Sequence, residues 1–160
     1  MWAGERRRIY GGRVDDIDKR IVVALVADGR MSYTDLGKLI GLSTSAVHQR
    51  VAKLEERGVL RGFRAVVDPE ALGLSLTAFI SVKPIDPAAP DDVPDRLRDL
   101  EEVEDCYSVA GDENYILKVR VGAPGELETL LGRIRSVAEV STRTTVVLST
   151  PFEDRLRDMR

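Results

Sequence analysis

Cysteine and histidine are nearly absent from this chain, which has one of each, Cys106 and His48, among 160 residues. A single cysteine cannot form an intrachain disulfide, and nothing in the composition indicates secretion. A structural zinc site needs four thiolate or imidazole ligands, and these two residues cannot supply them. We therefore expect no metal site, and we expect no cofactor.

Long hydrophobic runs are also missing, since the longest, Ile21–Ala27, is far shorter than the ~20 residues that span a bilayer. Residues 1–13 carry Arg6–Arg8 and Arg13 but no apolar core segment, so we interpret them as a flexible basic arm and not a secretory signal. A hydrophobic fraction of 43% and a charged fraction of 32% are typical of a globular protein. We expect a cytoplasmic location and no membrane partner.

Charge is divided unevenly along the chain. Residues 1–68 hold 13 Lys and Arg against 9 Asp and Glu, a net charge of +4, whereas residues 69–160 hold 11 against 18, a net charge of −7. This asymmetry favours a first half that binds a polyanion and a second half with another task. It is a weak signal alone, because net charge governs non-specific binding and not the fold.

Three short helices are predicted in residues 14–58. Each follows a residue that can cap it: Asp15, Ser32, and Ser43 or Thr44. Each is followed by a glycine that can end it: Gly29, Gly41 and Gly58. Apolar residues at helical spacing predict the three inner faces: Ile17, Ile21, Val22 and Leu25; Leu36, Leu39 and Ile40; Val47, Val51 and Leu54.

The second and third helices are joined by a three-residue turn, Gly41–Ser43, which is the pattern of a helix-turn-helix. The third helix would then lie in the major groove of double-stranded DNA. Its candidate DNA-binding residues are the polar ones at its start and outer face: Ser43, Thr44, Ser45, His48, Gln49, Arg50 and Lys53. Gln can bond an adenine edge, and Ser and Thr can bond bases or phosphates.

Alternatives remain at this helix. Any surface helix turns polar residues outward, so residue types alone decide little. Arg50 can contact a phosphate or brace the helix pair internally, and His48 can be a pH switch or a surface residue.

Residues 59–73 are predicted as a hinge strand and linker. Phe63, Ala65 and Val67 alternate with Arg64 and Val66, which is typical of extended backbone. Asp68-Pro69 then ends the strand, and Gly73 closes a short helical turn.

Residues 74–150 read as strand, helix, strand, strand, helix, strand. The strands are expected at 74–83, 103–110, 115–121 and 140–148, with two-residue alternation. The helices have inner faces of Val93, Leu97 and Leu100, and of Leu127, Leu130, Leu131 and Ile134. This order predicts an α+β fold, a ferredoxin-like βαββαβ sandwich with helices on one face of the sheet. Residues 151–160 are predicted to be a charged C-terminal tail.

The other face of the sheet carries apolar residues in places, such as Phe79, Ile116 and Val147. An exposed apolar sheet face predicts a homodimer. A dimer also suits a helix-turn-helix protein, because its two reading helices can bind two DNA half-sites that lie about 34–36 Å apart.

From Val14 to Thr150 the chain resembles the Lrp/AsnC family, the feast/famine transcriptional regulators. The resemblance is carried by Asp15–Ile21, by Gly41–Ser43 with Val47–Glu55, by Gly58–Phe63 with Asp68-Pro69, and by Val109–Tyr115. It implies a winged helix-turn-helix domain, a hinge strand, and a ferredoxin-like domain for ligand binding and oligomerisation. It also implies dimers that assemble further, often to octamers, and an amino acid effector bound between dimers.

Carried over to this chain, the effector loop is Ala110, Gly111, Asp112, Glu113, Asn114 and Tyr115, with Thr142 and Thr144 as the complement from a neighbouring subunit. The loop departs from the family pattern at Asn114, where an acidic residue is usual. Asp112 or Glu113 can still bind an ammonium group, and backbone N–H groups near Gly111 can bind a carboxylate. A plain hairpin turn is the alternative interpretation of this segment.

The sequence allows two rival functions. An architectural DNA-binding protein of the same fold would need no effector. An enzyme would use Cys106, Tyr107 or Asp112, but no base accompanies them, because the one histidine lies in the reading helix. We therefore predict a sequence-specific DNA-binding regulator that is not an enzyme.

Overall fold

The structure is a computed structural model of the chain, and it describes residues 14–153. The predicted basic arm (1–13) and most of the predicted tail (154–160) lie outside the described residues. The described chain divides into two compact units between Ala65 and Val66. We name residues 14–65 the helical unit and residues 66–151 the sheet unit.

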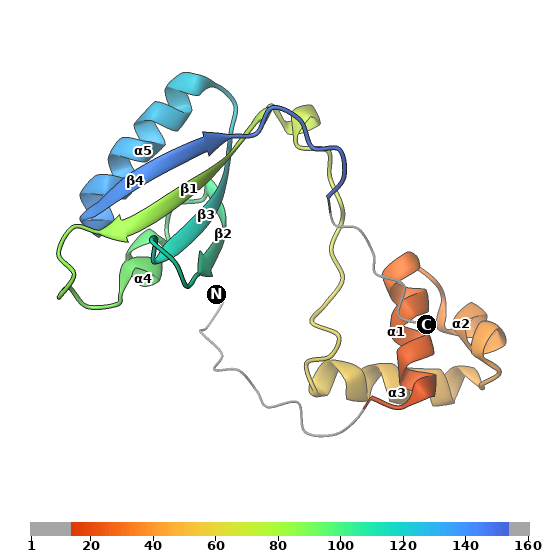
Figure 1. Ribbon diagram of the computed structural model, residues 1–160. Helices are drawn as coiled ribbons and strands as arrows, with labels where there is room; N and C mark the ends of the chain where they lie inside the picture. Colours follow the sequence, from red (N-terminus) through yellow and green to blue (C-terminus); the bar gives the residue numbers. More distant parts are fainter. Residues whose placement is uncertain (1–13, 154–160) are drawn as a thin grey trace. The chain divides into compact units, whose positions relative to one another are not determined.

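The helical unit contains three helices, α1 (Asp16–Ala27), α2 (Tyr33–Ile40) and α3 (Thr44–Glu56) (Figure 1). Their capping residues are those predicted, because the side chains of Asp15, Ser32 and Ser43 accept hydrogen bonds from backbone N–H groups three residues on. Each cap satisfies a donor that the first turn of a helix leaves unpaired.

The core of the helical unit is small. Its eight buried apolar residues are Ile21, Ala24, Leu25, Leu36, Ile40, Val47, Val51 and Leu54. The prediction was wrong for Leu39, which is 59% exposed because it lies one position away from the buried stripe of α2.

The turn between α2 and α3 depends on two glycines. Gly41 adopts a left-handed φ of 84°, which favours glycine. At Gly37 a Cβ would lie 2.6 Å from the carbonyl oxygen of Leu42, so no larger residue fits without a shift of the turn. Gly37 was missed in the sequence because it lies inside a helix.

The predicted hinge strand over Val59–Val67 is not formed. The segment is extended, but neither it nor any other part of residues 14–65 is a strand, so the described helical unit has no wing strand. A strand is defined by its ladder to a neighbour, and alternation alone supplies none. Val66 is accordingly 91% exposed. The short helical turn that follows, Glu70–Leu72, is closed by Gly73 as predicted.

The sheet unit has the predicted element order. It contains β1 (Leu76–Pro84), α4 (Val93–Leu97), β2 (Val103–Ser108), β3 (Tyr115–Val121), α5 (Pro124–Ala138) and β4 (Val140–Val146). The sheet order is β2-β3-β1-β4, and all three pairings are antiparallel. Figure 1 shows α5 lying along one face of this sheet. Leu148 falls beyond β4 and is 97% exposed, so the fourth strand is shorter than predicted.

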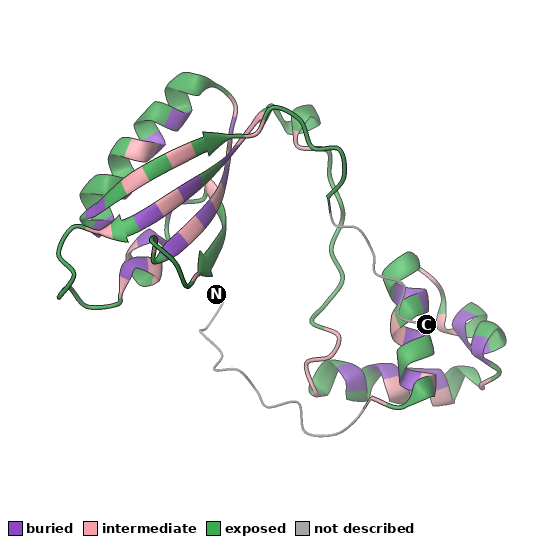
Figure 2. Ribbon diagram, in the orientation of Figure 1, coloured by how far each residue is buried: buried purple, intermediate pink, exposed green. Residues whose placement is uncertain are grey.

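Alternation along the strands builds the core of the sheet unit. Figure 2 shows buried residues at every second position of β1 and β3. They pack with the inner sides of α4 and α5 into a cluster that includes Ile80, Leu117, Leu130 and Ile134. None of the helices in residues 14–153 is long and apolar enough to cross a membrane.

Candidate DNA interface and ligand loop

The outer face of α3 presents Ser45, His48 and Gln49, and all three are exposed. Lys53 is exposed one turn after Gln49. Val47, Val51 and Leu54 hold the opposite side of the helix in the core, which fixes the rotation of α3 about its axis. The exposure that DNA contact requires is therefore present at these predicted positions.

The first residues of α3 are already hydrogen-bonded within the chain. The Ser43 hydroxyl accepts from the backbone N–H of Ala46 at 3.2 Å and lies 3.1 Å from the Ser45 hydroxyl. Thr44 donates from its hydroxyl to that of Thr34 at 3.4 Å. Ser43 therefore has a structural task as the cap of the helix, whatever it contributes to DNA binding.

His48 packs against the preceding helix. Its ring lies edge-on to that of Tyr33, with 5.6 Å between ring centroids and an interplanar angle of 81°. This contact orients the imidazole on the surface of α3 and ties the two helices of the motif together.

Arg50 braces α3 against the first helix. Its guanidinium donates to Asp15 at 2.8 Å and to the buried Asp18 at 2.7 Å. These hydrogen bonds raise the pKa of Arg50 above its ordinary value, and the bond from Arg50 is the main cause of the lowered pKa of Asp15. Of the two roles left open for Arg50, the structure shows the internal one.

The loop between β2 and β3 is held at both ends. The N–H of Val109 donates to the carbonyl of Asn114 at 3.0 Å, and the N–H of Asn114 donates to the carbonyl of Val82 at 3.1 Å. The second bond holds the loop at the end of β1, one of the two inner strands of the sheet. Asp112 and Asn114 are exposed. Gly111 has no atom near the position of a Cβ, so within the chain its size is not required.

Tyr115 is the one predicted loop residue that belongs to the core. Its side chain is 3% exposed, and its hydroxyl donates to Asp91 in the proline-rich loop before α4. The bond to Asp91, together with burial, raises the pKa of Tyr115 to about 12. Tyr115 therefore connects the loop before α4 to the start of β3.

The side chain of Glu113 extends over β1 toward β4. Its carboxylate accepts from Arg143, which was not among the predicted residues. A hydrogen bond from its own backbone N–H lowers the pKa of Glu113, and the charge of Arg143 lowers it further. Arg143 could have been noticed in the sequence as the cation between the two threonines of the last strand.

Thr142 and Thr144 lie on the opposite face of the sheet from Arg143. They pair in register with the buried Val82 and Ile80, and antiparallel partners share a face, so both threonines point toward the helices. Their predicted role toward a neighbouring subunit stays a prediction.

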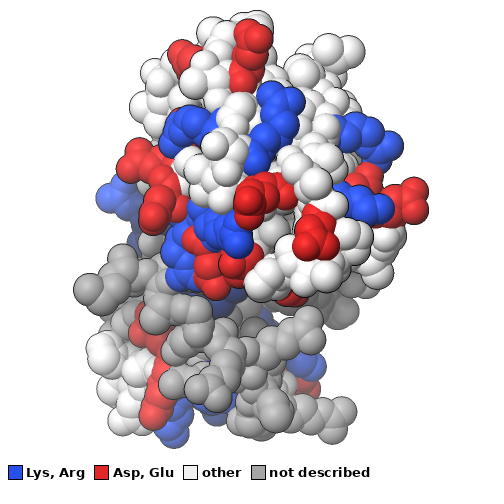
Figure 3. Space-filling view, turned by 90° about the vertical axis from the view of Figure 1, so that its left-hand side faces the viewer, with Lys and Arg blue, Asp and Glu red and all other residues white. Residues whose placement is uncertain are grey.

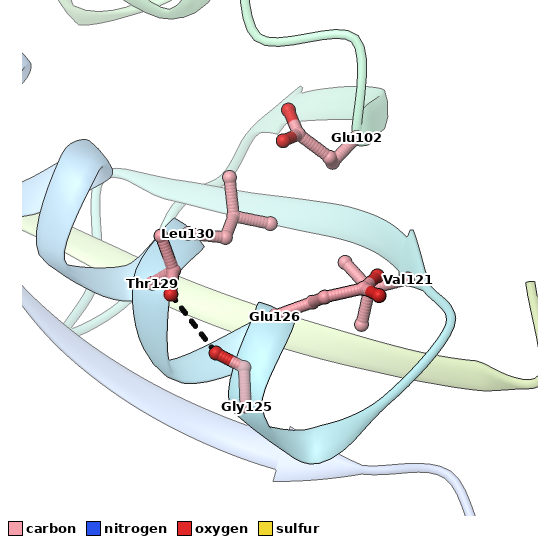
Figure 4. Close-up of a pocket in the computed structure, with 6 residues that line it drawn as sticks. All are labelled: Glu102, Val121, Gly125, Glu126, Thr129 and Leu130. Carbon is pink, nitrogen blue, oxygen red and sulfur yellow. Dashed lines mark hydrogen bonds between the residues drawn. The ribbon is translucent and has the colours of Figure 1, made fainter.

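A separate pocket of about 340 Å³ lies at the other end of β3, beside the first turn of α5. Figure 4 shows its lining residues, Glu102, Val121, Gly125, Glu126, Thr129 and Leu130. The polar groups there already have partners. Glu126 accepts from the N–H of Gly122, Glu102 pairs with Arg133, and Thr129 donates to the carbonyl of Gly125. Among the side chains coloured in Figure 3, acidic and basic ones are interspersed, with no large patch of one sign.

A helix-turn-helix with an exposed polar reading helix, followed by a four-stranded ferredoxin-like sheet, defines a DNA-binding protein with a second, regulatory domain. Residues 14–55 match the AsnC-type helix-turn-helix domain, and residues 77–156 match the Lrp/AsnC ligand binding domain. The chain belongs to the Lrp/AsnC family of transcriptional regulators, as the resemblance implied.

Relatives of known name are similar over most of their length. The HTH-type transcriptional regulator LrpA of Mycobacterium tuberculosis is 52% identical over 142 residues, which cover 89% of this chain and 95% of LrpA. The leucine-responsive regulatory protein of Escherichia coli is 36% identical over 143 residues, which cover 86% of this chain and 87% of that protein. Both are regulators, which confirms the prediction that the chain is not an enzyme.

Solved structures agree with the fold. The feast or famine regulatory protein from M. tuberculosis, solved in complex with L-methionine, superposes with a TM-score of 0.89 at 51% identity, covering 91% of this chain and 99% of that one. E. coli AsnC superposes with a TM-score of 0.79 at 29% identity, covering 91% and 99%.

Proposed function

We propose that this protein is a sequence-specific DNA-binding transcriptional regulator controlled by an amino acid. The observation that carries the first part is the outer face of α3, where Ser45, His48 and Gln49 are exposed while Arg50 is held by α1. Gln49 and His48 contact base edges, and Ser45 and Thr44 contact bases or phosphates. Lys53 contacts phosphate, which positions the helix without reading sequence. The predicted cytoplasmic location is part of this proposal.

A homodimer, further assembled to a higher oligomer such as an octamer, presents the reading helices in pairs. The open face of the sheet supports this, because Phe79 is 40% and Tyr107 50% exposed on it. Apolar side chains on a sheet face are stabilised when a second copy covers them.

The effector binds at the loop Ala110–Tyr115, between dimers, with Thr142 and Thr144 contributed by a neighbouring subunit. Two facts support an amino acid as the ligand class. Residues 77–156 match a ligand binding domain, and a protein 51% identical was solved with L-methionine. The exposed amide of Asn114, in place of a carboxylate, affects which amino acid binds.

The DNA proposal is tested by selecting duplexes from a random pool with the full chain and measuring affinity against salt. We expect a steep loss of affinity as salt rises, because phosphate contacts release counterions. Gln49→Ala should weaken binding to the selected duplex by about 5–150-fold and leave random duplexes nearly unaffected. Lys53→Gln should weaken both and lower the salt slope by about 1.

Lys38→Gln is the matched control, since Lys38 is an exposed lysine of α2 outside the predicted reading face. Equal affinity of the unaltered protein for selected and random duplexes would contradict sequence-specific recognition and favour the architectural alternative. Effector binding is tested by titrating each standard amino acid in a calorimeter, and no heat from any of them would refute the ligand class.

A further inference from the structure

The two residues of α3 that contact base edges in the proposed function are held differently. His48 lies edge-on to Tyr33, the first residue of α2, with 5.6 Å between the ring centroids and 81° between the ring planes. In residues 14–153 no hydrogen bond or ring contact involves the side chain of Gln49, which is exposed. The aromatic contact therefore restricts His48 and leaves Gln49 without a comparable restraint in the described chain.

The start of α2 runs along one side of α3 over two turns. The Thr44 hydroxyl donates to that of Thr34 at 3.4 Å, and Thr34 directly follows Tyr33. Thr44 and His48 are four residues apart on one helix, so their side chains are neighbours on the same face. Tyr33 is also partly buried against the core of the helical unit, which holds its ring in place. The contact with His48 thus comes from a side chain that is itself fixed.

We infer that Tyr33 is a positioning residue for DNA recognition, which sets the orientation of the His48 imidazole for discrimination at one base pair. This rests on the proposed function. A neutral imidazole has one N–H donor and one acceptor nitrogen, so the base edge that it can bond depends on how the ring is turned. Edge-to-face packing against a second ring restricts that turn. Tyr33 acts on sequence preference through His48 and touches no base itself.

The ring of Tyr33, and not its hydroxyl, carries this role. Within the described part of the chain the hydroxyl takes part in no hydrogen bond, whereas the ring contacts His48. A side chain that is ordered beforehand loses less entropy on binding, so loss of the ring should weaken binding to the selected duplex by about 2–10-fold. Tyr33→Leu removes the ring and keeps an apolar side chain against the core, and Tyr33→Phe keeps the ring and removes the hydroxyl.

The first measurement follows the His48 ring by proton NMR in the untagged full chain without DNA. His48 is the one histidine of the sequence, so its imidazole C–H resonances are identified directly. An aromatic ring shifts the resonances of protons close to it. Tyr33→Leu should therefore move the His48 resonances, while Tyr33→Phe and the control Lys38→Gln, elsewhere on α2, should leave them nearly in place. Unchanged resonances in Tyr33→Leu would overturn the inference.

The second measurement assigns the effect to a base pair. Affinity is measured for the selected duplex and for duplexes in which each base pair is changed in turn. His48→Ala identifies the base pair at which discrimination is lost, and Tyr33→Leu should lose discrimination there while Tyr33→Phe keeps it. After His48→Ala, Tyr33→Leu should have no further effect. Gln49→Ala is the matched control, because it should lose discrimination at another base pair, which Tyr33→Leu leaves unaffected.

Each contrary result has a distinct meaning. If the unaltered protein does not prefer the selected duplex, the proposed function fails and the inference fails with it. If that preference holds but His48→Ala loses discrimination at no base pair, the inference alone is overturned. It is equally overturned if Tyr33→Leu weakens binding to all duplexes alike, or if Tyr33→Phe loses the same discrimination, since the hydroxyl would then act on DNA directly. Circular dichroism melting establishes that each variant is folded, and Tyr33→Met replaces Tyr33→Leu if the latter is not.

Discussion

The helical unit and the sheet unit are stabilised in different ways. The helical unit has eight buried apolar residues, and each of its three helices begins with a side-chain cap. The sheet unit has 15 buried residues in its core cluster, while α4 and α5 begin without a side-chain cap hydrogen bond. Small cores bury too little surface to order short helices by themselves, so local polar bonds contribute a larger share of stability.

Two ion pairs, one from each unit, lie in different surroundings. In the helical unit the buried carboxylate of Asp18 meets Arg50 at 2.7 Å and Arg57 at 3.8 Å, and thereby joins α1 to α3. In the sheet unit the Glu113–Arg143 pair lies on the surface, over a sheet whose backbone ladder already holds the strands together. The sheet unit also has less exposed ion pairs, because Glu104 meets Lys118 and Arg120, whose side chains are 14% exposed.

The largest expected effect comes from matched leucine truncations. Leu36 in α2 is 0% exposed and Leu130 in α5 is 1% exposed. Each change to Ala should cost about 2–5 kcal/mol of unfolding free energy. Leu36→Ala should abolish protection of the helical unit in hydrogen exchange while the sheet unit stays protected, and Leu130→Ala should leave both units folded. Equal loss of protection in both units after either change would contradict the comparison.

Next in size is Asp18→Asn. It leaves Arg50 and Arg57 facing a neutral amide, and because both arginine side chains are about 30% exposed, we expect a loss of about 2–3 kcal/mol, below the value for a fully buried pair. Asp16→Asn is the control, since Asp16 pairs with Lys19 on the surface, and should change stability by less than about 0.5 kcal/mol. Urea unfolding followed by circular dichroism measures both. Similar losses of unfolding free energy in the two variants would show that the ion pairs of Asp18 do not stabilise the packing of α1 against α3.

A smaller effect separates capping from DNA recognition in neighbouring serines. Ser43→Ala removes the cap of α3 and should cost about 1 kcal/mol of stability. Ser45→Ala should leave stability nearly unchanged but weaken binding to the selected duplex. Thermal melting and duplex affinity are measured for both variants. If only Ser45→Ala lost stability, the assignment of Ser43 as the cap of α3 would be wrong.

The smallest effect at neutral pH concerns Tyr115 of the sheet unit. Its pKa is raised from 10.0 to about 12, so the neutral hydroxyl is favoured in the folded state. The contribution is complete below about pH 10 and falls as pH rises through about 12, reaching a loss of about 1 kcal/mol at pH 11. Tyr115→Phe should lack this alkaline loss. Urea midpoints at pH 8 and pH 11 test it, and an identical alkaline loss in the variant would contradict it.

Local signals in the sequence predicted the helical unit well. The caps at Asp15, Ser32 and Ser43 are short-range effects that depend on neighbouring backbone groups. Alternation likewise predicted the inward residues of β1 and β3, since one sheet face is covered by helices. The strand predicted over residues 59–67 is absent from the described chain, because a strand needs a partner strand and no local pattern provides one.

In the candidate sites, too, the sequence predicted what depends on neighbouring residues and not the contacts between distant ones. The outward position of His48 and Gln49 follows from the helical period and was predictable. The ion pairs of Arg50 with Asp15 and Asp18, and of Arg143 with Glu113, join residues 30 or more positions apart in sequence. Nothing in the spacing of such residues indicates that they meet.

By itself the sequence determined the element order, the helix caps, the buried stripe of α3 and the family, because these depend on periodicity and on chemistry within a few residues. The tertiary structure alone decided that Arg50 joins α3 to α1 and that Arg143 of β4 pairs with Glu113 of the loop between β2 and β3. The physical reason is the same in both cases: a charged side chain takes the partner that folding brings within a few ångströms, and only the packing of distant elements sets that distance.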